Sequence, residues 1–255
     1  MKVVILAGGF GTRLSEYTDS IPKPMVEVGG KPIIWHVMNI YAEYGYKDFV
    51  IALGYKAEVI KNYFANYHIG QNDFTVNLAN GNLNQHDSKV LDWNVTLVDT
   101  GLHTMTGGRV KRLKDFLDDT FLLTYGDGVA DVEIDKLVEF HKKSSNPLTL
   151  TAVRPTARFG ELEISESNKI VSFEEKPQMH SGWINGGFFV CEKEVLDLIE
   201  GDHEMFEREP MQRIITKKGI SAYKHKGFWQ CMDSKRDNDQ LNEIWESGRV
   251  PWIRN

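Results

Sequence analysis

The sequence predicts an α/β fold built on a mostly parallel but mixed sheet that is flanked by helices. Three observations indicate it. Short apolar runs alternate with segments whose apolar residues recur every three or four positions, the patterns of buried strands and of amphipathic helices. The first run, Val3 to Ala7, is wholly apolar and ends at glycines, as expected for a strand covered on both faces. A β-α-β order also implies parallel strands joined by right-handed crossovers.

The individual elements follow from this pattern in chain order. Pro32 opens a helical stretch that ends before Gly45, because proline fits the first turn of a helix and glycine its end. Short apolar runs predict the strands, which become more mixed in the second half of the chain. The expected strands are 3–7, 49–53, 95–98, 121–125, 148–153, 161–164, 170–173 and 221–225. The expected helices are 32–41, 57–67, 134–140, 192–200, 205–218 and 237–246.

Residues 67–93 interrupt this order with a polar stretch that holds five asparagines. We interpret the stretch as an insertion, and Asn80-Gly81 within it is a hairpin-turn signal. A loop of this length inside a compact domain is usually functional, so we expect an oligomer interface or a lid. The alternative is a simple solvated excursion.

Composition and charge exclude several classes of protein. The 255 residues include 41% hydrophobic and 26% charged residues, which are ordinary values for a globular domain and exclude a disordered chain. The net charge of −6 argues against a nucleic-acid partner. The chain has no run of eighteen apolar residues, and its first apolar run is too short for a signal peptide, so we expect a cytoplasmic protein without a membrane partner. Cys191 and Cys231 form no C-x-x-C pair, and we expect reduced thiols.

The first candidate site is the glycine-rich segment Gly8-Gly9-Phe10-Gly11-Thr12-Arg13, which directly follows the first strand. Glycines allow consecutive backbone N–H groups to approach a phosphate, and Arg13 adds a permanent positive charge. The spacing matches neither the dinucleotide fingerprint nor the P-loop. The segment therefore predicts a phosphate cradle of another kind, the alternative being a plain glycine turn.

The second candidate is Lys23, which lies between Pro22 and Pro24. Two prolines hold the chain extended, so the position of the ammonium group would be fixed. The alternative is a solvated lysine in a proline turn.

Two aspartates are candidate metal ligands. Asp127, between Gly126 and Gly128, follows an apolar strand, and ligands of open α/β sheets lie beyond the carboxyl ends of strands. Asp233 is the second carboxylate, and two suffice for a hard divalent ion when substrate phosphates complete its shell. The alternative for Asp127 is an ordinary Asp-Gly turn, and we expect Asp131 to cap the next helix.

Two further segments suit a sugar. Glu174-Glu175-Lys176-Pro177 combines acids and a base, and Trp183 to Phe188 places Asn185 and two glycines in an aromatic setting. Sugar hydroxyls need carboxylate and amide partners above a flat apolar floor. The alternatives are a charged strand end and a bulged core strand.

Together these residues indicate phosphoryl or nucleotidyl transfer. No catalytic triad motif and no zinc spacing occurs in the sequence. What remains is the glycine cradle, the two aspartates and four cations, and in such chemistry the protein mainly positions groups and neutralises charge. The four cations are Arg13, Lys23, Arg109 and Lys176.

Taken in order along the whole chain, these motifs resemble the sugar-1-phosphate nucleotidylyltransferase family. The shared motifs are Gly8-Gly9-x-Gly11-Thr12-Arg13-Leu14, Pro22-Lys23-Pro24, Asp127, Glu175-Lys176-Pro177, Asn185-Gly186-Gly187 and Asp233. More specific segments are similar to the members that use CTP and glucose 1-phosphate to make CDP-glucose. These are Lys23 to Glu27, Trp35-His36, Asp99 to Gly101, Thr104 to Arg109, Arg158 to Gly160 and Gly227 to Gln230. Phe10 and Cys231 depart from the expected Leu and Pro without changing a charge.

The resemblance implies a single Rossmann-like nucleotide-diphospho-sugar transferase domain over 1–255, Mg²⁺ as cofactor, and a homo-oligomer, with a hexamer as the suggested number. It also implies a role at the start of dideoxysugar synthesis for bacterial surface polysaccharide, and catalytic roles for Arg13 and Lys23. The implied nucleotide-binding residues are Leu6, Ala7, Gly8, Gly9, Phe10, Gly11, Thr12, Arg13, Thr104, Arg109 and Gly128. The implied sugar-phosphate residues are Lys23, Glu175, Lys176 and Asn185, and the implied metal ligands are Asp127 and Asp233. The same chemistry with dTTP or UTP, or a non-catalytic sugar-nucleotide-binding protein, remains the alternative.

Overall fold

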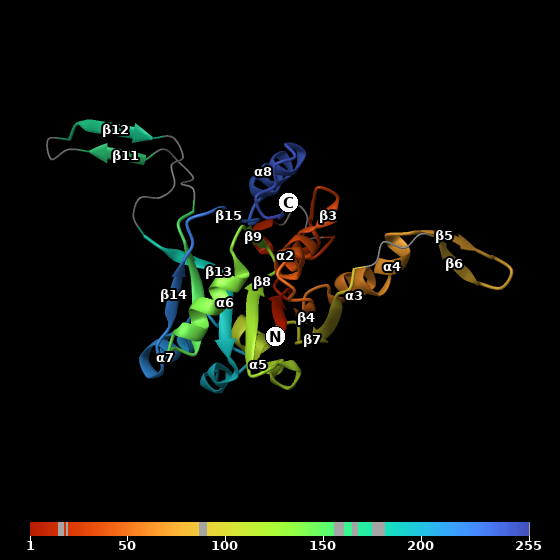
Figure 1. Ribbon diagram of the computed structural model, residues 1–255, viewed down its shortest axis with the longest axis horizontal. Coiled ribbons are helices and arrows are strands. Elements are labelled where there is room, and N and C mark those ends of the chain that lie inside the picture. The colour runs from red at the N-terminus through yellow and green to blue at the C-terminus, as the bar shows by residue number, and fades with distance from the viewer. Residues whose placement is uncertain are drawn as a thin grey trace.

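A seven-stranded mixed sheet forms the centre of the computed structural model, which describes residues 1–14, 18, 20–86, 91–155, 161–164, 168–174 and 182–254 (Figure 1). The strand order is β14-β10-β13-β8-β1-β4-β7. These strands are β1 (Val3–Leu6), β4 (Asp48–Leu53), β7 (Asn94–Asp99), β8 (Thr120–Tyr125), β10 (Leu148–Val153), β13 (Ile184–Glu192) and β14 (Ser221–Lys224). The α/β fold class predicted from the sequence is confirmed.

Strand direction divides the sheet into two parts. The neighbours β8, β1, β4 and β7 are all parallel, as the β-α-β order predicts. β13 runs antiparallel to both β8 and β10, while β10 and β14 are parallel. The mixed half of the sheet therefore comes from the second half of the chain, where the sequence pattern is mixed too.

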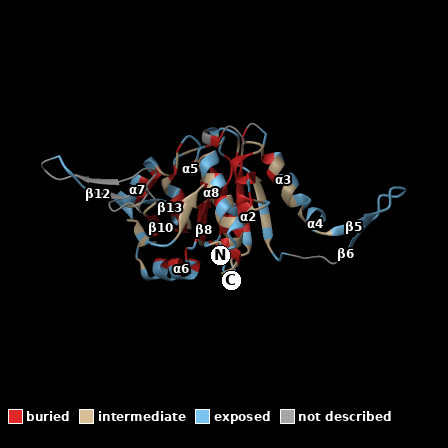
Figure 2. Cartoon of the chain, turned by 90° about the horizontal axis from the view of Figure 1, so that it is seen from above, coloured by how far each residue is buried: buried red, intermediate tan, exposed pale blue. Residues whose placement is uncertain are grey.

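Helices cover both faces of the sheet, so the chain has two apolar cores. Alternate residues of β1 point to opposite sides, with Val3 and Ile5 in one core and Val4 and Leu6 in the other. The first core contains α2 (Ile33–Ala42), α3 (Ala57–Ala65), α6 (Ile134–Lys143) and α8 (Lys235–Glu246). The second contains α5 (Thr106–Arg112) and α7 (Glu209–Lys217). Figure 2 shows buried residues concentrated along the sheet and the helix faces that meet it.

Short two-stranded pairs complete the fold. β9 (Gly128–Ala130) pairs antiparallel with β15 (Trp229–Cys231), and β2 (Glu27–Val28) pairs with β3 (Lys31–Pro32). β11 (Glu161–Ile164) and β12 (Ile170–Glu174) form one projecting hairpin. The cysteines Cys191 and Cys231 are free, as expected. None of the helices in the described part of the chain has the length and hydrophobicity that crossing a bilayer requires.

The predicted insertion is a second projecting hairpin. Here the chain forms the short helix α4 (Tyr67–Gly70) and the strands β5 (Asp73–Val76) and β6 (Leu83–His86), which extend away from the body (Figure 1). The hairpin turn predicted at Asn80-Gly81 is confirmed, since Gly81 has a φ of 75° and its N–H donates to the Asn77 carbonyl. We call residues 67–86 the arm.

Two expected helices are present with a different type or a later start, and the expected capping residue Asp131 is wrong. The region 192–200 is the end of β13 followed by a 3₁₀ helix, Lys193–Leu198, and the helix expected from 205 begins only at Glu209, where Pro210 fits its first turn. Asp131 does not cap α6, whose N-cap is Glu133, because its carboxylate pairs with His225 at 2.9 Å.

Candidate active site

A cavity of about 560 Å³ opens at the carboxyl ends of β1 and β8. This is where ligands bind in open α/β sheets, and the volume is typical of small-molecule sites. The nucleotide-binding residues predicted from Leu6 through Thr12 line it, together with Thr104, Arg109, Lys23 and Asp127. The structure thus brings most of the predicted site residues into one place.

The glycine-rich segment is held in shape from behind. The Gly8 carbonyl accepts hydrogen bonds from the Tyr55 N–H at 3.1 Å and from Arg109 Nη2 at 3.0 Å. The Gly8 carbonyl and the Gly9 N–H belong to the same trans peptide, in which C=O and N–H point in opposite directions. Since the carbonyl faces Arg109, the Gly9 N–H points away from Arg109. Gly11 has a φ of 64°, a backbone conformation that side chains other than glycine's rarely adopt. The segment is therefore braced from behind and turned sharply at Gly11, which is compatible with the predicted phosphate cradle.

Arg109 holds this segment with a buried guanidinium group. Nη1 donates to the carbonyls of Leu53 and Gly101 and to Thr100 Oγ1, each at 2.8 Å, and Nη2 donates to the carbonyls of Gly8 and Leu102. Burial lowers the pKa of Arg109, but an arginine keeps its charge at any physiological pH. A Cβ at Gly8 would overlap the guanidinium. Arg109 lines the cavity, but its Nη1 and Nη2 groups donate to backbone carbonyls and to Thr100 of the protein itself. They therefore brace the backbone around the cavity.

We expect Arg109→Ala to lower the free energy of unfolding by about 3 kcal/mol, because it removes the hydrogen bonds that the buried guanidinium donates to four backbone carbonyls. Urea denaturation followed by circular dichroism measures this change. Arg112→Ala, three residues later on the same helix, is the matched control, since its ion pair with Asp202 is exposed and its loss should change the free energy of unfolding much less. Equal losses in the two variants would contradict the bracing role of Arg109.

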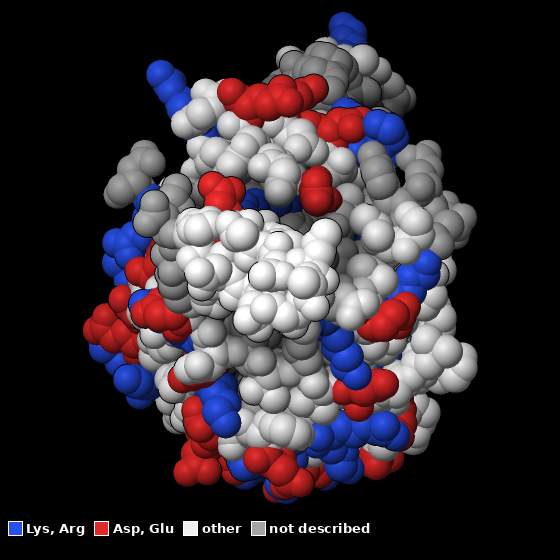
Figure 3. All heavy atoms as spheres, turned by 90° about the vertical axis from the view of Figure 1, so that its right-hand side faces the viewer, with Lys and Arg blue, Asp and Glu red and all other residues white. Residues whose placement is uncertain are grey.

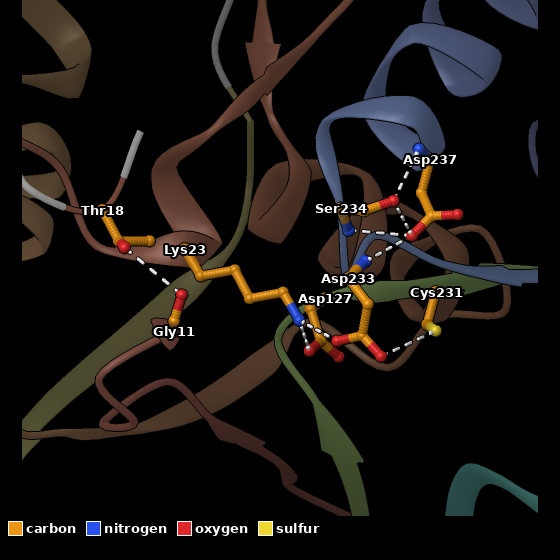
Figure 4. Close-up of polar contacts among 8 residues, drawn as sticks. All are labelled: Gly11, Thr18, Lys23, Asp127, Cys231, Asp233, Ser234 and Asp237. Atoms are coloured by element: carbon orange, nitrogen blue, oxygen red, sulfur yellow. Dashed lines mark hydrogen bonds and ion pairs between the residues drawn. The ribbon is translucent and has the colours of Figure 1, made fainter. Parts of the chain in front are cut away.

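The charged centre of the site is Lys23, which lies between two carboxylates (Figure 4). Its Nζ is 2.6 Å from Asp127 Oδ2 and 2.6 Å from Asp233 Oδ1. Lys23 is only 9% exposed, and the pKa of its ammonium reflects opposing effects. Burial lowers this pKa, but the charges and hydrogen bonds of Asp127 and Asp233 together outweigh burial and raise it. The ammonium therefore stays charged.

Three elements fix the positions of the two aspartates. The ladder between β9 and β15 pairs Gly128 with Cys231, and the Met232 N–H donates to the Asp127 carbonyl at 2.8 Å. Asp233 directly precedes the N-cap of α8, and its N–H donates to Asp237 Oδ2 at 3.0 Å. Ser234 and Asp237 form the capping box of that helix. Both carboxylates thus lie on rigid backbone.

The Cys231 thiol contacts the Asp233 carboxylate oxygen that does not bind Lys23. Its Sγ lies 3.6 Å from Asp233 Oδ2 (Figure 4). Burial, then the charges of Asp233 and Asp127, raise the pKa of the Cys231 thiol to about 12, so the thiol stays protonated and can donate. Cys231 at the position where Pro was expected therefore adds a weak donor.

The donor set fits a hard divalent cation. Two carboxylates converge on a point that a cationic group occupies, and oxygen ligands are those that Mg²⁺ prefers. In the described part of the chain no cluster of three or more His, Cys, Asp or Glu side chains could hold a metal alone. Mg²⁺ usually binds through one or two carboxylates plus substrate phosphates. Asp127 and Asp233 would hold it in that way.

The sequence did not predict a polar network beside the cavity. The Tyr125 hydroxyl donates to Glu207 Oε1 at 2.7 Å and accepts from Asn185 Nδ2 at 3.1 Å, and Thr106 Oγ1 donates to Glu207 Oε2 at 2.6 Å. Burial and the Glu207 carboxylate raise the pKa of Tyr125, which keeps its proton. Tyr125 lies two residues before Asp127 at a strand end, a position that could have marked it, whereas Glu207 has no local signal.

Some predicted residues lie elsewhere. Gly128 is buried within β9 and does not line the cavity, and Asn185 lies outside it at the start of β13. Glu175 and Lys176 lie outside the described residues, as does the segment 158–160. The backbone of Arg13 lies in the 3₁₀ turn Thr12–Leu14, and its side chain is not among those described. Their roles stay predictions.

Comparison with known proteins agrees with this geometry. The sequence matches the nucleotidyl transferase family over residues 2–246. It is 50% identical to the glucose-1-phosphate cytidylyltransferases of Salmonella typhi and Salmonella typhimurium, over 99% of this chain and 98% of each of theirs. The structure superposes on that of HddC from Yersinia pseudotuberculosis with a TM-score of 0.70 at 24% identity, covering 96% of this chain and 99% of that one. The last likeness shows the shared fold. The chain belongs to the nucleotidyl transferase family.

Proposed function

We propose that the chain transfers the cytidylyl group of CTP to α-D-glucose 1-phosphate in a Mg²⁺-dependent reaction that yields CDP-glucose and diphosphate. The observation that carries this proposal is the Lys23 ammonium between Asp127 and Asp233, beside a glycine-lined cavity. The Salmonella relatives, at 50% identity, carry the name of this activity. The reaction would supply CDP-glucose to the synthesis of dideoxysugars for surface polysaccharide.

The chain's own residues contribute position and charge. An oxygen of the sugar phosphate attacks the α-phosphorus, a new P–O bond forms, and the bond to the bridging oxygen breaks as diphosphate leaves. No general base is needed, since a phosphate monoester with a second pKa of about 6 is mostly dianionic at neutral pH. The barrier is repulsion between anions, which Lys23 and the N–H groups of the glycine segment reduce. A bound Mg²⁺ would neutralise phosphate charge in the same place.

Pyrophosphate release tests the proposal. Purified protein, Mg²⁺ and glucose 1-phosphate are incubated with CTP, UTP, dTTP, ATP or GTP in parallel. We expect a strong preference for CTP. Equal or faster release with another nucleotide would contradict the base assignment, and no release with any nucleotide would favour the sugar-nucleotide-binding alternative. Since CTP is an intracellular metabolite, the proposal also implies a cytoplasmic protein.

We further propose that the arm, residues 67–86, joins copies of the chain into a homo-oligomer, with a hexamer as the number that the family resemblance implies. The arm exposes large apolar side chains, with Leu78 91% exposed. Asp73 is its single residue of the types Asp, Glu, Lys and Arg, and Figure 3, which faces the arm, shows few such side chains there. A lone two-stranded hairpin is marginally stable in water, so the arm needs a partner surface.

The partner surface we propose for it is the apolar groove at the arm's base on a second copy. This groove has a volume of about 430 Å³ and lies against the edge strand β7. It is lined by Phe64, Ala65, Tyr67, His68, Leu91, Trp93, Val95 and Leu97. No described residue of the arm lines the candidate active-site cavity of its own chain, and this favours an oligomer interface over a lid.

We expect the double variant Phe74→Ser, Leu78→Ser to shift the protein toward monomers by weakening this contact, while it stays folded. Size-exclusion chromatography with light scattering at micromolar concentration measures the mass of wild type and variant. Phe116→Ser, an exposed site in the body, is the control and should keep the wild-type mass. A monomeric wild type, or an unchanged mass in the double variant, would contradict the proposal.

A further inference from the structure

Four polar side chains form a continuous hydrogen-bonded chain beside the cavity. It runs from Asn185 on β13 through Tyr125 at the end of β8 and Glu207, just before α7, to Thr106 at the start of α5. Of these, Tyr125 and Thr106 line the cavity. This hydrogen-bonded chain thus connects Asn185, a predicted sugar-phosphate-binding residue, with the wall of the predicted nucleotide site.

The direction of every hydrogen bond in this chain is determined. An ionised carboxylate only accepts, so the hydroxyls of Tyr125 and Thr106 must both donate to Glu207. Thr106 Oγ1 in turn accepts from the Phe206 N–H at 2.8 Å. Since the proton of Tyr125 is used on Glu207, its oxygen is left to accept from the Asn185 amide. Glu207 therefore sets the polarity of the whole chain.

This polarity orients Asn185. Its Oδ1 accepts from the Gly187 N–H at 2.9 Å, and one hydrogen of Nδ2 is donated to Tyr125. Across the residues that the structure describes, the second hydrogen of Nδ2 has no acceptor, and Asn185 is exposed. The amide is thus held at both ends, and its second N–H is left exposed, where an external acceptor can reach it. A sugar hydroxyl is an acceptor of that kind.

We propose that Tyr125 and Glu207 are positioning residues for the sugar substrate, which present one N–H of Asn185 to a hydroxyl oxygen of the sugar. This inference rests on the proposed function, because it takes glucose 1-phosphate as the sugar phosphate. Neither residue needs to touch the reacting phosphates. The Tyr125 hydroxyl is already bonded to Glu207 and Asn185, so we expect the effect of both residues to fall on sugar recognition and not on nucleotide recognition.

Steady-state kinetics of two variants test the proposal. In Glu207→Gln the side-chain amide can donate to Tyr125, whose proton then faces the Asn185 N–H, so two donors oppose each other. Tyr125→Phe removes the acceptor while the ring keeps its contact with Phe189. We expect KM for glucose 1-phosphate to rise about tenfold in each, the scale of one lost hydrogen bond. KM for CTP should stay within about twofold of wild type.

Two further readouts separate positioning from a general structural defect. Residues that act as one unit give non-additive effects, so the double variant should be no worse than either single one. With 2-, 3-, 4- and 6-deoxyglucose 1-phosphate, the penalty should vanish for the analogue that lacks the contacted hydroxyl. Glu209→Gln, an exposed site two residues away, is the matched control and should behave as wild type. Thermal melts verify that each variant is folded.

The outcomes distinguish this inference from the proposed function. Equal rises in both KM values, or an unchanged KM for glucose 1-phosphate in folded variants, would overturn the positioning role. A wild type that prefers another nucleotide contradicts the proposed base but leaves the test intact with that nucleotide. If wild type releases no pyrophosphate, calorimetric titration with glucose 1-phosphate replaces the kinetics. A tenfold weaker Kd in Glu207→Gln then supports the inference, and an unchanged Kd overturns it.

Discussion

We expect Asp127→Asn to lower turnover about 100-fold, equal to about 2.7 kcal/mol in the barrier, while the protein stays folded. Asn keeps the shape of the side chain and one oxygen, but it removes the negative charge that lies 2.6 Å from the Lys23 ammonium. With one carboxylate lost, a bound divalent cation would keep only Asp233 of the two proposed carboxylate ligands. We therefore expect the Mg²⁺ concentration for half-maximal activity to rise.

Turnover measured against Mg²⁺ concentration at saturating CTP and glucose 1-phosphate tests this. Asp131→Asn is the matched control. Asp127 directly precedes β9 and Asp131 directly follows it, but Asp131 pairs with His225 and not with Lys23. We expect it to retain wild-type turnover. A folded Asp127→Asn variant with wild-type activity would contradict the role of Asp127 as a metal ligand.

Lys23→Ala is the second large effect, and we expect turnover to fall at least about tenfold, equal to about 1.4 kcal/mol. The variant removes the cation that would offset the charge of the reacting phosphates. Because the ammonium and a divalent cation meet the same two carboxylates, its loss should lower the Mg²⁺ concentration needed for half-maximal activity. The Mg²⁺ dependence thus shifts in opposite directions in the Lys23 and Asp127 variants.

The measurement is the same turnover assay, with circular dichroism to verify folding. Lys23→Arg keeps the positive charge and should lie between wild type and Lys23→Ala. Lys47→Ala, which breaks an exposed ion pair with Asp92, is the control and should be fully active. Wild-type turnover in Lys23→Ala would be incompatible with the proposed reaction.

The sequence predicts the parts of this molecule that depend on local pattern. The first strand and its glycine segment are contiguous in the chain, so their apolar run and turn chemistry reveal them together. The hairpin turn at Asn80-Gly81 is visible for the same reason. The direction of β13 is not, because strand periodicity is the same in parallel and antiparallel sheets.

Features set by tertiary contacts escape such prediction. Helix α5 carries Gly107 and Gly108, which disfavour a helix, but a Cβ at either position would crowd the backbone of residues 202–204. Glu207 meets Tyr125 and Thr106 from 82 and 101 positions away, so no window of sequence contains the network. The ion pair of Lys23 with Asp233 was not predicted, because 210 positions separate the two residues.

That pairing makes the order of synthesis matter. Lys23 reaches Asp127 across 104 positions and Asp233 across 210, so the second bond requires a residue that is synthesised much later. A ribosome makes the glycine segment first, and a nascent chain can fold its early strands while Asp233 is still missing. Partly made or prematurely terminated chains would therefore possess the phosphate cradle without the complete charged centre. The charged centre is therefore complete only after Asp233 has been synthesised, 210 positions after Lys23.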